Sequence, residues 1–178
     1  MGKIRIIGGE HRSRQLLVLD SDGLRPTLDR VKETLFNWLG QDLTRQNCLD
    51  LFAGSGSLGF EAISRNAQSV IMVEKSLQVA QQLISNAKLL RAENCQVINL
   101  TAEKFLSKNS QKFDVIFLDP PYSSDLLQQN LQQISSHLSE SGVIYVEYHQ
   151  NKPDLNQFNI LKQCKAGSVN YALLSLKE

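Results

Sequence analysis

The sequence predicts an α/β protein with a doubly wound, mostly parallel seven-stranded sheet and a short N-terminal hairpin and helix as an extension. Three observations predict this fold. Short apolar runs alternate with helical patterns from residue 47 onward, which is typical of parallel strands joined by crossover helices. A glycine-rich turn follows the first of these runs, where doubly wound folds bind ligands. The last two runs have no helical pattern between them, which favours an antiparallel edge.

The first 40 residues predict the extension. One or two short strands are expected before residue 22, around the turn signal Gly8-Gly9. Thr27 suits the N-cap of a following helix, and Gly40 suits its end. The apolar residues of this helix recur at helical spacing: Leu28, Val31, Leu35, Trp38 and Leu39. We therefore divide the chain into an extension, residues 1–40, and one compact domain, residues 41–178.

The domain predicts an alternation of strands and helices. Strands are expected at residues 47–52, 69–73, 95–100, 113–118, 142–147, 158–161 and 169–176. Helices are expected near residues 57–65, 76–90 and 124–138. Every motif discussed below lies at the carboxyl end of one of these strands, where the sheet is expected to bind its ligand.

Composition indicates a globular protein in the cytoplasm. The chain has 178 residues, of which 42% are hydrophobic and 21% charged, and no apolar run approaches a membrane span. The N-terminus lacks the apolar core of a signal peptide. The cysteines Cys48, Cys95 and Cys164 lie far apart, so we expect free buried thiols and no metal site. Without an apolar heptad pattern we expect a monomer.

Positive charge gathers near the N-terminus although the net charge is only +1. Up to residue 14, four cations stand against one acid, Glu10. The cations of this region are Lys3, Arg5, Arg12, Arg14, Arg25, Arg30 and Lys32. Such a cluster favours binding to the phosphates of a polyanion. The alternative for each single residue is ordinary solvated surface.

The glycine-rich turn predicts a nucleotide-like ligand. Residues 54–59 match the pattern G-x-G-x-x-G, which alone would suggest a dinucleotide. Asp50, four residues before Gly54, would suit a cationic ligand better than a pyrophosphate. Glu74 closes the next strand, where a carboxylate could accept hydrogen bonds from ribose hydroxyls. The alternative for Asp50 is a carboxylate that caps a turn or helix.

A second motif, Asp119-Pro120-Pro121-Tyr122, follows the strand at residues 113–118. Two prolines fix the backbone and remove two amide donors. The carboxylate of Asp119 and the carbonyl oxygens of the turn are then acceptors for a group such as an exocyclic amine. Tyr122 offers an aromatic face for a base. The alternative is a proline-rich turn with a surface tyrosine.

The chain resembles the RsmD family of class I, Rossmann-like S-adenosylmethionine-dependent methyltransferases. The matching segments are residues 5–9, 23–27, 29–39, 50–56, 73–75, 119–122, 145–147 and 166–167. They span nearly the whole chain. The stretch R-P-T-x-D-R-V-x-E-T-L-F-N-W-L is specific to the family, whereas the glycine loop and D-P-P-Y occur in many methyltransferases.

The resemblance implies methylation of a guanine N2 in 16S ribosomal RNA, at position 966, within a small-subunit assembly particle. The implied contacts with S-adenosylmethionine are Asp50, Phe52, Ala53, Gly54, Ser55, Gly56, Glu74, Lys75, Thr101, Ala102 and Asp119. Asp119, Pro120, Pro121 and Tyr122 would hold the target base. The RNA-facing residues would be Arg5, Arg12, Arg14, Arg25, Thr27 and Arg30. Thr101 stands where the family often has an acid that contacts adenine.

Other functions stay open on the residues alone. An NAD-dependent oxidoreductase would use the same glycine loop, but His11, His137 and His149 have no setting for proton relay. A noncatalytic RNA-binding module would not need the intact Asp-Pro-Pro-Tyr motif. A methyltransferase of another nucleic-acid base, or of a protein glutamine, would keep the chemistry and change the substrate.

Overall fold

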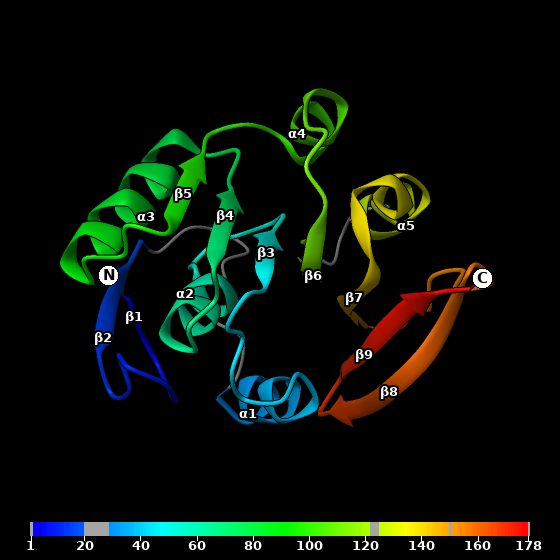
Figure 1. The fold of residues 1–178 in the computed structure, drawn as a ribbon, viewed down its shortest axis with the longest axis horizontal. Helices are drawn as coiled ribbons and strands as arrows, with labels where there is room; N and C mark the ends of the chain where they lie inside the picture. The colour runs from blue at the N-terminus through cyan, green and yellow to red at the C-terminus, as the bar shows by residue number, and fades with distance from the viewer. Residues whose placement is uncertain (1, 20–28, 122–124, 150, 178) are drawn as a thin grey trace.

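A computed structural model describes residues 2–19, 29–121, 125–149 and 151–177 (Figure 1). Its main sheet has the strand order β5-β4-β3-β6-β7-β9-β8. The bounds are β3 Asn47–Asp50, β4 Ser69–Val73, β5 Cys95–Ile98, β6 Phe113–Leu118, β7 Leu138–Tyr148, β8 Phe158–Ala166 and β9 Val169–Leu176. The first five of these strands pair in parallel, and β9 pairs antiparallel with β7 and β8. The predicted doubly wound, mostly parallel sheet with an antiparallel edge is confirmed.

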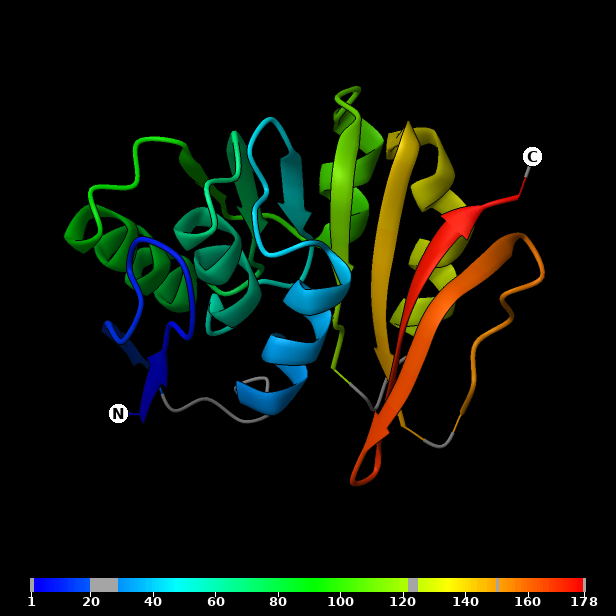
Figure 2. The same ribbon diagram turned by 60° about the horizontal axis from the view of Figure 1, so that its bottom comes forward.

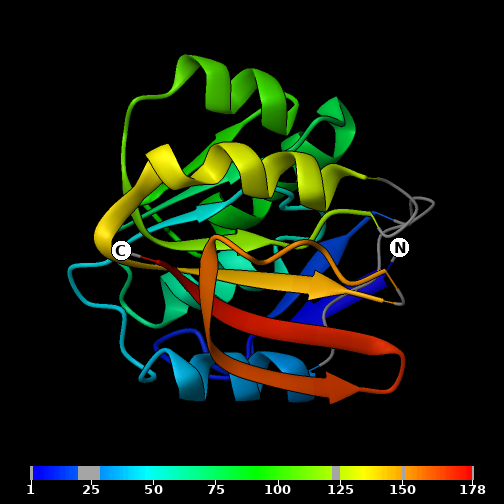
Figure 3. The same ribbon diagram turned by 90° about the vertical axis from the view of Figure 1, so that its right-hand side faces the viewer.

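Helices cover both faces of this sheet (Figures 2 and 3). On one face lie α1 Asp29–Trp38, α2 Ser57–Ser64 and α3 Leu77–Leu89. On the other lie α4 Ala102–Lys108, α5 Leu126–Gln133 and the 3₁₀ turn Ile134–His137. Each face therefore has its own apolar core, which leaves the sheet buried on both sides as parallel strands require.

The strand order reverses between β3 and β6. From β3 the chain proceeds outward to β4 and β5, and from β6 it proceeds outward in the opposite direction to β7. The crossover connections leave an opening at the carboxyl ends of these two strands, which is the usual ligand site of a doubly wound sheet. Both motifs found in the sequence, at Asp50 and at Asp119, lie at this point.

The predicted N-terminal hairpin is confirmed. Strands β1 Gly2–Arg5 and β2 Gln15–Val18 pair antiparallel and lie beside α2 and α3 (Figure 1). The turn between them docks on the end of α2, where the N–H of Glu10 donates to the carbonyl of Ser64 at 2.7 Å. Gly9 has φ +74°, and a Cβ there would lie 1.8 Å from that carbonyl oxygen. The turn signal in the sequence is thus a position that only glycine can occupy.

A buried ion cluster ties the extension to the sheet domain. Glu61 of α2 is fully buried and accepts hydrogen bonds from the backbone N–H groups of Ile7 and Gly8. Its carboxylate also lies 2.9 Å from Nε of Arg65 and 3.8 Å from Nζ of the buried Lys32. The carboxylate is therefore compensated by two cations and two amide donors, as a buried charge must be.

Three boundary predictions were wrong. Helix α4 was not expected, because its seven residues show too little periodicity. The helix expected at residues 124–138 ends earlier: α5 stops at Gln133, a 3₁₀ turn follows, and Leu138 belongs to β7, where it pairs with Phe113. Strand β8 continues to Ala166, because edge-strand residues exposed to solvent carry no apolar alternation.

The three cysteines are free, as expected. Cys48 is buried and Cys95 partly buried, but Cys164 is exposed, so the expectation of buried thiols was wrong at this position. The reason is again the edge strand β8, which is exposed on both sides from residue 159 to residue 165. No helix among the described residues is long and apolar enough to span a membrane. The same residues contain no group of His, Cys, Asp and Glu side chains that could hold a metal ion.

Candidate active site

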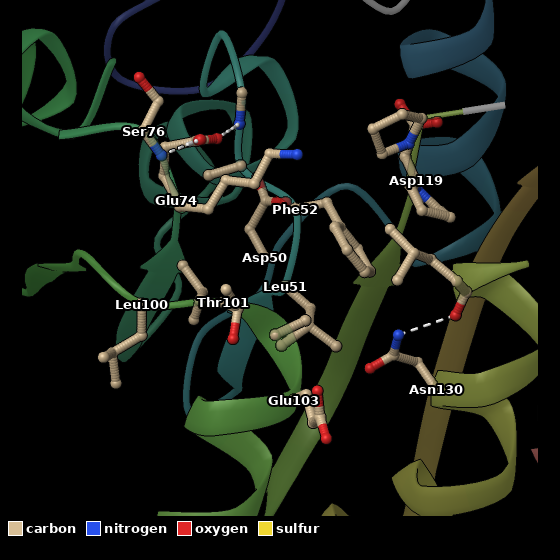
Figure 4. A pocket seen from close by; sticks show the side chains of 18 of the residues that line it. Asp50, Leu51, Phe52, Glu74, Ser76, Leu100, Thr101, Glu103, Asp119 and Asn130 are labelled. Carbon is tan, nitrogen blue, oxygen red and sulfur yellow. Dashed lines mark hydrogen bonds between the residues drawn. The ribbon is translucent and has the colours of Figure 1, made fainter. Parts of the chain in front are cut away.

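A cavity of about 1080 Å³ opens at the carboxyl ends of β3 and β6. Figure 4 shows Glu74 and Thr101 on one side of it, Asp119 and Asn130 on the other, and Phe52 between them. The predicted residues that line it are Asp50, Phe52, Ala53, Gly54, Ser55, Glu74, Lys75, Thr101, Ala102, Asp119, Pro120 and Pro121. Residues from four parallel strands, far apart in the sequence, thus share one space.

Asp50 ends β3 and is only 2% exposed. Its carboxylate accepts a hydrogen bond from the N–H of Gly59 at 3.0 Å, so it caps the first turn of α2 while it also lines the cavity. The interpretation as a turn or helix cap is confirmed, and the contact with a cationic ligand stays a prediction. The pKa of Asp50 is raised to about 7, mainly by burial, against the lowering effect of the Gly59 hydrogen bond and with a smaller rise from the charge of Glu74. A cationic ligand would favour its ionised form.

Glu74 fixes the shape of the glycine loop. One carboxylate oxygen accepts from the N–H of Gly54 at 3.0 Å, and the other from the N–H of Ser76 at 2.8 Å (Figure 4). Each carboxylate oxygen has a second lone pair, so both can still accept a hydrogen bond from a ligand. Glu74 therefore connects the ends of two neighbouring strands and presents acceptors to the cavity.

The two loop glycines have different tasks. Gly54 lines the cavity and has φ +50°. Gly56 has φ +77° and donates its N–H to the carbonyl of Ala53 at 2.7 Å, but it is not among the lining residues. A Cβ on Gly56 would lie 2.5 Å from the ring of Phe60. Gly56 thus makes the turn, and Gly54 allows close approach of a ligand.

Thr101 follows β5 and lines the cavity, and its contact with the cofactor stays a prediction. The hydroxyl of Thr101 accepts from the N–H of Lys104 at 3.3 Å and so forms the N-cap of α4. The neighbouring Glu103, which was not predicted, is exposed and lines the cavity. The missed signal was Thr101 three residues before Lys104 and the apolar pair Phe105-Leu106, because this is a cap followed by an acid, Glu103, in the first helical turn.

Asp119 follows β6 directly and is partly buried, and the next residue, Pro120, is buried. Burial raises the pKa of the Asp119 carboxyl well above its usual value, and the nearby charges of Glu147 and Asp50 raise it further. A carboxyl group of this kind can hold or take a proton at neutral pH. Tyr122, the last residue of the motif, lies outside the described residues.

Helix α5 supplies a wall of the cavity that was not predicted. Its contributions are Leu126, Gln129, Asn130, Gln132 and Gln133. Asn130 is 4% exposed, and its amide nitrogen donates to the backbone carbonyl of Leu126 at 2.7 Å. A run of Gln and Asn on a helix that packs against the sheet was the available signal, because amides are seldom placed on a buried face without a polar neighbour.

Comparison with known proteins decides the family. Residues 4–175 match the family model described as Conserved hypothetical protein 95. The chain is 46% identical over 180 residues to Ribosomal RNA small subunit methyltransferase D of Haemophilus influenzae, covering 97% of this chain and 93% of that protein. The chain belongs to the RsmD family.

Further members support this assignment. The protein of the same name from Escherichia coli is 48% identical over 148 residues, which cover 82% of this chain and 75% of that protein. The solved structure of the Escherichia coli protein yhhF superposes with a TM-score of 0.89 at 40% identity and covers 99% of both chains. The fold is that of class I S-adenosylmethionine-dependent methyltransferases, and the resemblance found in the sequence is confirmed.

The cations assigned to RNA do not all lie together in this RsmD-family chain. Arg5 and Arg12 line one hollow, whereas Arg14 lines another, beside His11 and Arg91. Arg5 donates to Asp29 at 2.7 Å, so an acid already compensates part of its charge. Arg30 is exposed on α1. Burial raises the pKa of Tyr171, and the charge of Arg30 opposes this rise. The residues Arg25 and Thr27 lie outside the described part of the chain.

Proposed function

We propose that this protein transfers a methyl group from S-adenosylmethionine to the exocyclic N2 of a guanine in 16S ribosomal RNA, at the position 966 that the family resemblance implies. The observation that carries the proposal is the position of Asp50 and Asp119. Asp50 ends β3, Asp119 directly follows the adjacent parallel strand β6, and both line one cavity. One strand end suits a cationic nucleoside, and the other offers acceptors for an aromatic amine.

The cavity has the features that a sulfonium nucleoside requires. Among the described residues, the buried hydroxyl of Ser57 on its wall has no hydrogen-bond partner, which suggests that a ligand completes the site. Glu74 would accept from the ribose hydroxyls, and Gly54 would allow the nucleoside to lie against the loop. Burial raises the pKa of both Asp50 and Asp119, and a bound cation would favour the ionised form of each. When bound, S-adenosylmethionine supplies an electrophilic methyl group.

Asp119 and Pro120 would hold the amine that receives the methyl group. The carboxylate of Asp119 and the carbonyl of Pro120 can each accept one N–H of an exocyclic NH2 group. These hydrogen bonds make the amine nitrogen more tetrahedral and its lone pair more available. They also stabilise the positive charge that grows on the nitrogen during attack. Alignment of the reacting atoms supplies much of the remaining acceleration.

The substrate would be a base displaced from its stack, because an amine inside a helix cannot reach the cavity. Bases in RNA loops leave the stack most readily. Arg5, Arg12, Arg14 and Arg30 of the described residues would contact phosphates and so position the loop, as would Arg25 and Thr27 of the segment outside them. The names of the relatives support ribosomal RNA of the small subunit, on its own or in an assembly particle.

Mass spectrometry of ribosomal RNA from cells with and without this protein tests the proposal. We expect one N2-methylguanosine of 16S RNA to disappear when the gene is deleted and to return with the wild-type chain, but not with Asp119→Ala. Loss of N6-methyladenosine would instead identify another base as the substrate. An unchanged set of methylated nucleosides would contradict the proposal, provided that the protein is present in the wild-type cells at a measurable level.

A further inference from the structure

The Tyr-x-Glu segment of β7 has no task in the mechanism described above. Tyr145 is fully buried and Glu147 is 4% exposed. The hydroxyl of Tyr145 donates to a carboxylate oxygen of Glu147 at 2.7 Å. A carboxylate buried this deeply costs stability unless it is hydrogen-bonded or has a function. The pair therefore calls for a physical explanation.

The register of the sheet places Glu147 beside Asp119. In the parallel pair of β6 and β7, Phe117 lies opposite Tyr145 and Leu118 opposite Val146. The next step along both strands brings Asp119 and Glu147 to neighbouring positions, on the face that carries Phe117 and Tyr145, because side chains alternate along a strand. In agreement, the charge of Glu147 has the largest effect of any neighbouring residue on the pKa of Asp119.

Several titratable groups face this carboxylate from the elements around it. Tyr145 approaches from its own strand, Asp119 from β6, and Tyr171 from β9, where it lies opposite Glu147 in the register. Arg30 of α1 acts on Tyr171, and Asp50 of β3 acts on Asp119. The ring of Tyr145 is held between Phe117, at 6.4 Å, and Tyr171, at 6.3 Å between ring centroids. Its hydroxyl therefore stays in one place and fixes Glu147.

We propose that Glu147, held by Tyr145, is a positioning residue that acts through Asp119 and receives the proton released by the methylated amine. This inference rests on the proposed function. After methylation the nitrogen carries a positive charge and must lose one of its two N–H protons. That N–H bond breaks, its electron pair stays on nitrogen, and an O–H bond forms on Asp119. The proton is then shared with the neighbouring carboxylate of Glu147.

Two carboxyl groups at neighbouring positions of adjacent strands have properties that neither has alone. Like charges disfavour simultaneous ionisation, so a pair in which both carboxyl groups are ionised readily takes up one proton. The negative charge of Glu147 makes Asp119 a stronger proton acceptor, and the Tyr145 hydroxyl keeps that charge on Glu147. Asp119 can thus accept from the amine and be ready for the next turnover once the pair has released its proton.

The test compares Glu147→Gln with the wild type in single-turnover methylation of small-subunit particles from cells that lack the protein. Gln has nearly the same shape and can still accept from Tyr145. We expect the acidic limb of the pH–rate profile to move to lower pH by about one unit, because a like charge beside Asp119 is gone. The plateau should fall about tenfold, because Asp119 becomes a weaker acceptor. Glu140→Gln, an exposed acid on the same strand, should change neither.

Titration of the Asp119 carboxyl carbon by NMR gives a readout that needs no RNA. The apparent pKa of Asp119 should be lower in Glu147→Gln than in the wild type. Tyr145→Phe keeps the Glu147 carboxyl group but removes the hydrogen bond that favours its ionised form. The acidic limb of the pH–rate profile should therefore also move to lower pH, by a smaller amount than in Glu147→Gln. Tyr145→Phe also provides the test if Glu147→Gln does not fold.

An acidic limb and an Asp119 titration that stay in place in both variants would overturn the inference. That result would leave the proposed function intact, provided that the wild type methylates the RNA. If the wild type methylates no guanine while Asp119 still titrates as expected, the proposed function fails instead.

Discussion

In the register of β3 and β6, Asp50 lies opposite Phe117, and Asp119 follows Phe117 by two residues. Both carboxyl groups line the same cavity, and the charge of Asp50 raises the pKa of Asp119. This relationship depends on the strand reversal at β3 and β6, because the crossover connections on the two sides of that point leave the cavity open between the two strand ends. The predictions below depend on it.

Asp119→Asn should slow methyl transfer far more than it weakens cofactor binding. The variant keeps a hydrogen-bond acceptor but cannot take a proton or carry negative charge. We expect single-turnover rates on small-subunit particles to fall by about 10² to 10⁴, while the dissociation constant for S-adenosylmethionine, measured by calorimetry, changes less than about tenfold. Asp125→Asn, at the exposed start of α5, is the matched control. Full turnover in Asp119→Ala would exclude this role.

Glu74→Gln should weaken cofactor binding. The two carboxylate oxygens of Glu74 accept hydrogen bonds from the backbone N–H groups of Gly54 and Ser76. A Gln side chain has only one oxygen, so its NH2 group would face one of these two N–H groups and lose that hydrogen bond. We expect the affinity for S-adenosylmethionine to fall at least about tenfold, which corresponds to about 1.4 kcal/mol. Calorimetry checks this, with the exposed Glu93→Gln as the control. Equal affinity for both variants would mean that Glu74 does not shape the site.

Asp50→Asn should stabilise the protein in a pH-dependent way. The pKa of Asp50 is about 7 when folded and 3.8 ordinarily, so the folded state binds a proton that the unfolded state releases. Its contribution to stability is fully present below pH 3.8 and is lost as the pH rises through 7. Asn keeps the acceptor for Gly59 and has no such loss.

Urea denaturation at pH 5 and pH 8 measures this difference. The free energy of unfolding of Asp50→Asn relative to the wild type should increase by about 2–3 kcal/mol between the two values. Asp42→Asn is the control. Asp42 is exposed, and hydrogen bonds from the Thr44 and Asn66 side chains lower its pKa, whereas the pKa of Asp50 is raised. A difference that does not change with pH would mean that Asp50 ionises normally in the folded protein.

RNA affinity should fall with added salt, and single cations should contribute unequally. We expect Arg12→Ala to make the plot of log affinity against log salt concentration less steep by about one, as the loss of one phosphate contact would. Arg5→Ala should have a smaller effect, because Asp29 already binds its guanidinium. The exposed Lys112 precedes β6 at the opposite end of the sheet, so Lys112→Ala should change nothing. Filter binding at several salt concentrations separates these outcomes, and a flat salt response would exclude a phosphate-binding surface.

Motifs that combine a strand with a turn were predictable from the sequence. Asp50, Gly54 and Glu74 follow buried apolar runs, and an apolar run that alternates with helical patterns determines both the strand and its direction in the sheet. The carboxyl ends of parallel strands lie at one edge, so these residues had to meet. The same reasoning correctly brought Asp119 to the cavity.

Features that depend on packing between distant elements were not predictable. The wall formed by Gln129 and Asn130 requires α5 to lie in one orientation over the carboxyl end of the sheet, which the apolar face of the helix alone does not define. Glu103 depends on α4, a helix too short for its periodicity to be detected. The adjacency of Glu147 and Asp119 depends on the register of β6 and β7, which includes an irregularity between Phe113 and Val115.

Nucleoside analysis of small-subunit particles methylated by the purified protein tests the central claim most directly. Particles from cells lacking the protein are incubated with S-adenosylmethionine, and their RNA is digested and analysed by mass spectrometry. The account predicts about one N2-methylguanosine for each particle with the wild type, and none with an Asp119→Ala variant that still binds the cofactor. Methylation of a different base, or undiminished N2-methylguanosine with Asp119→Ala, would contradict it.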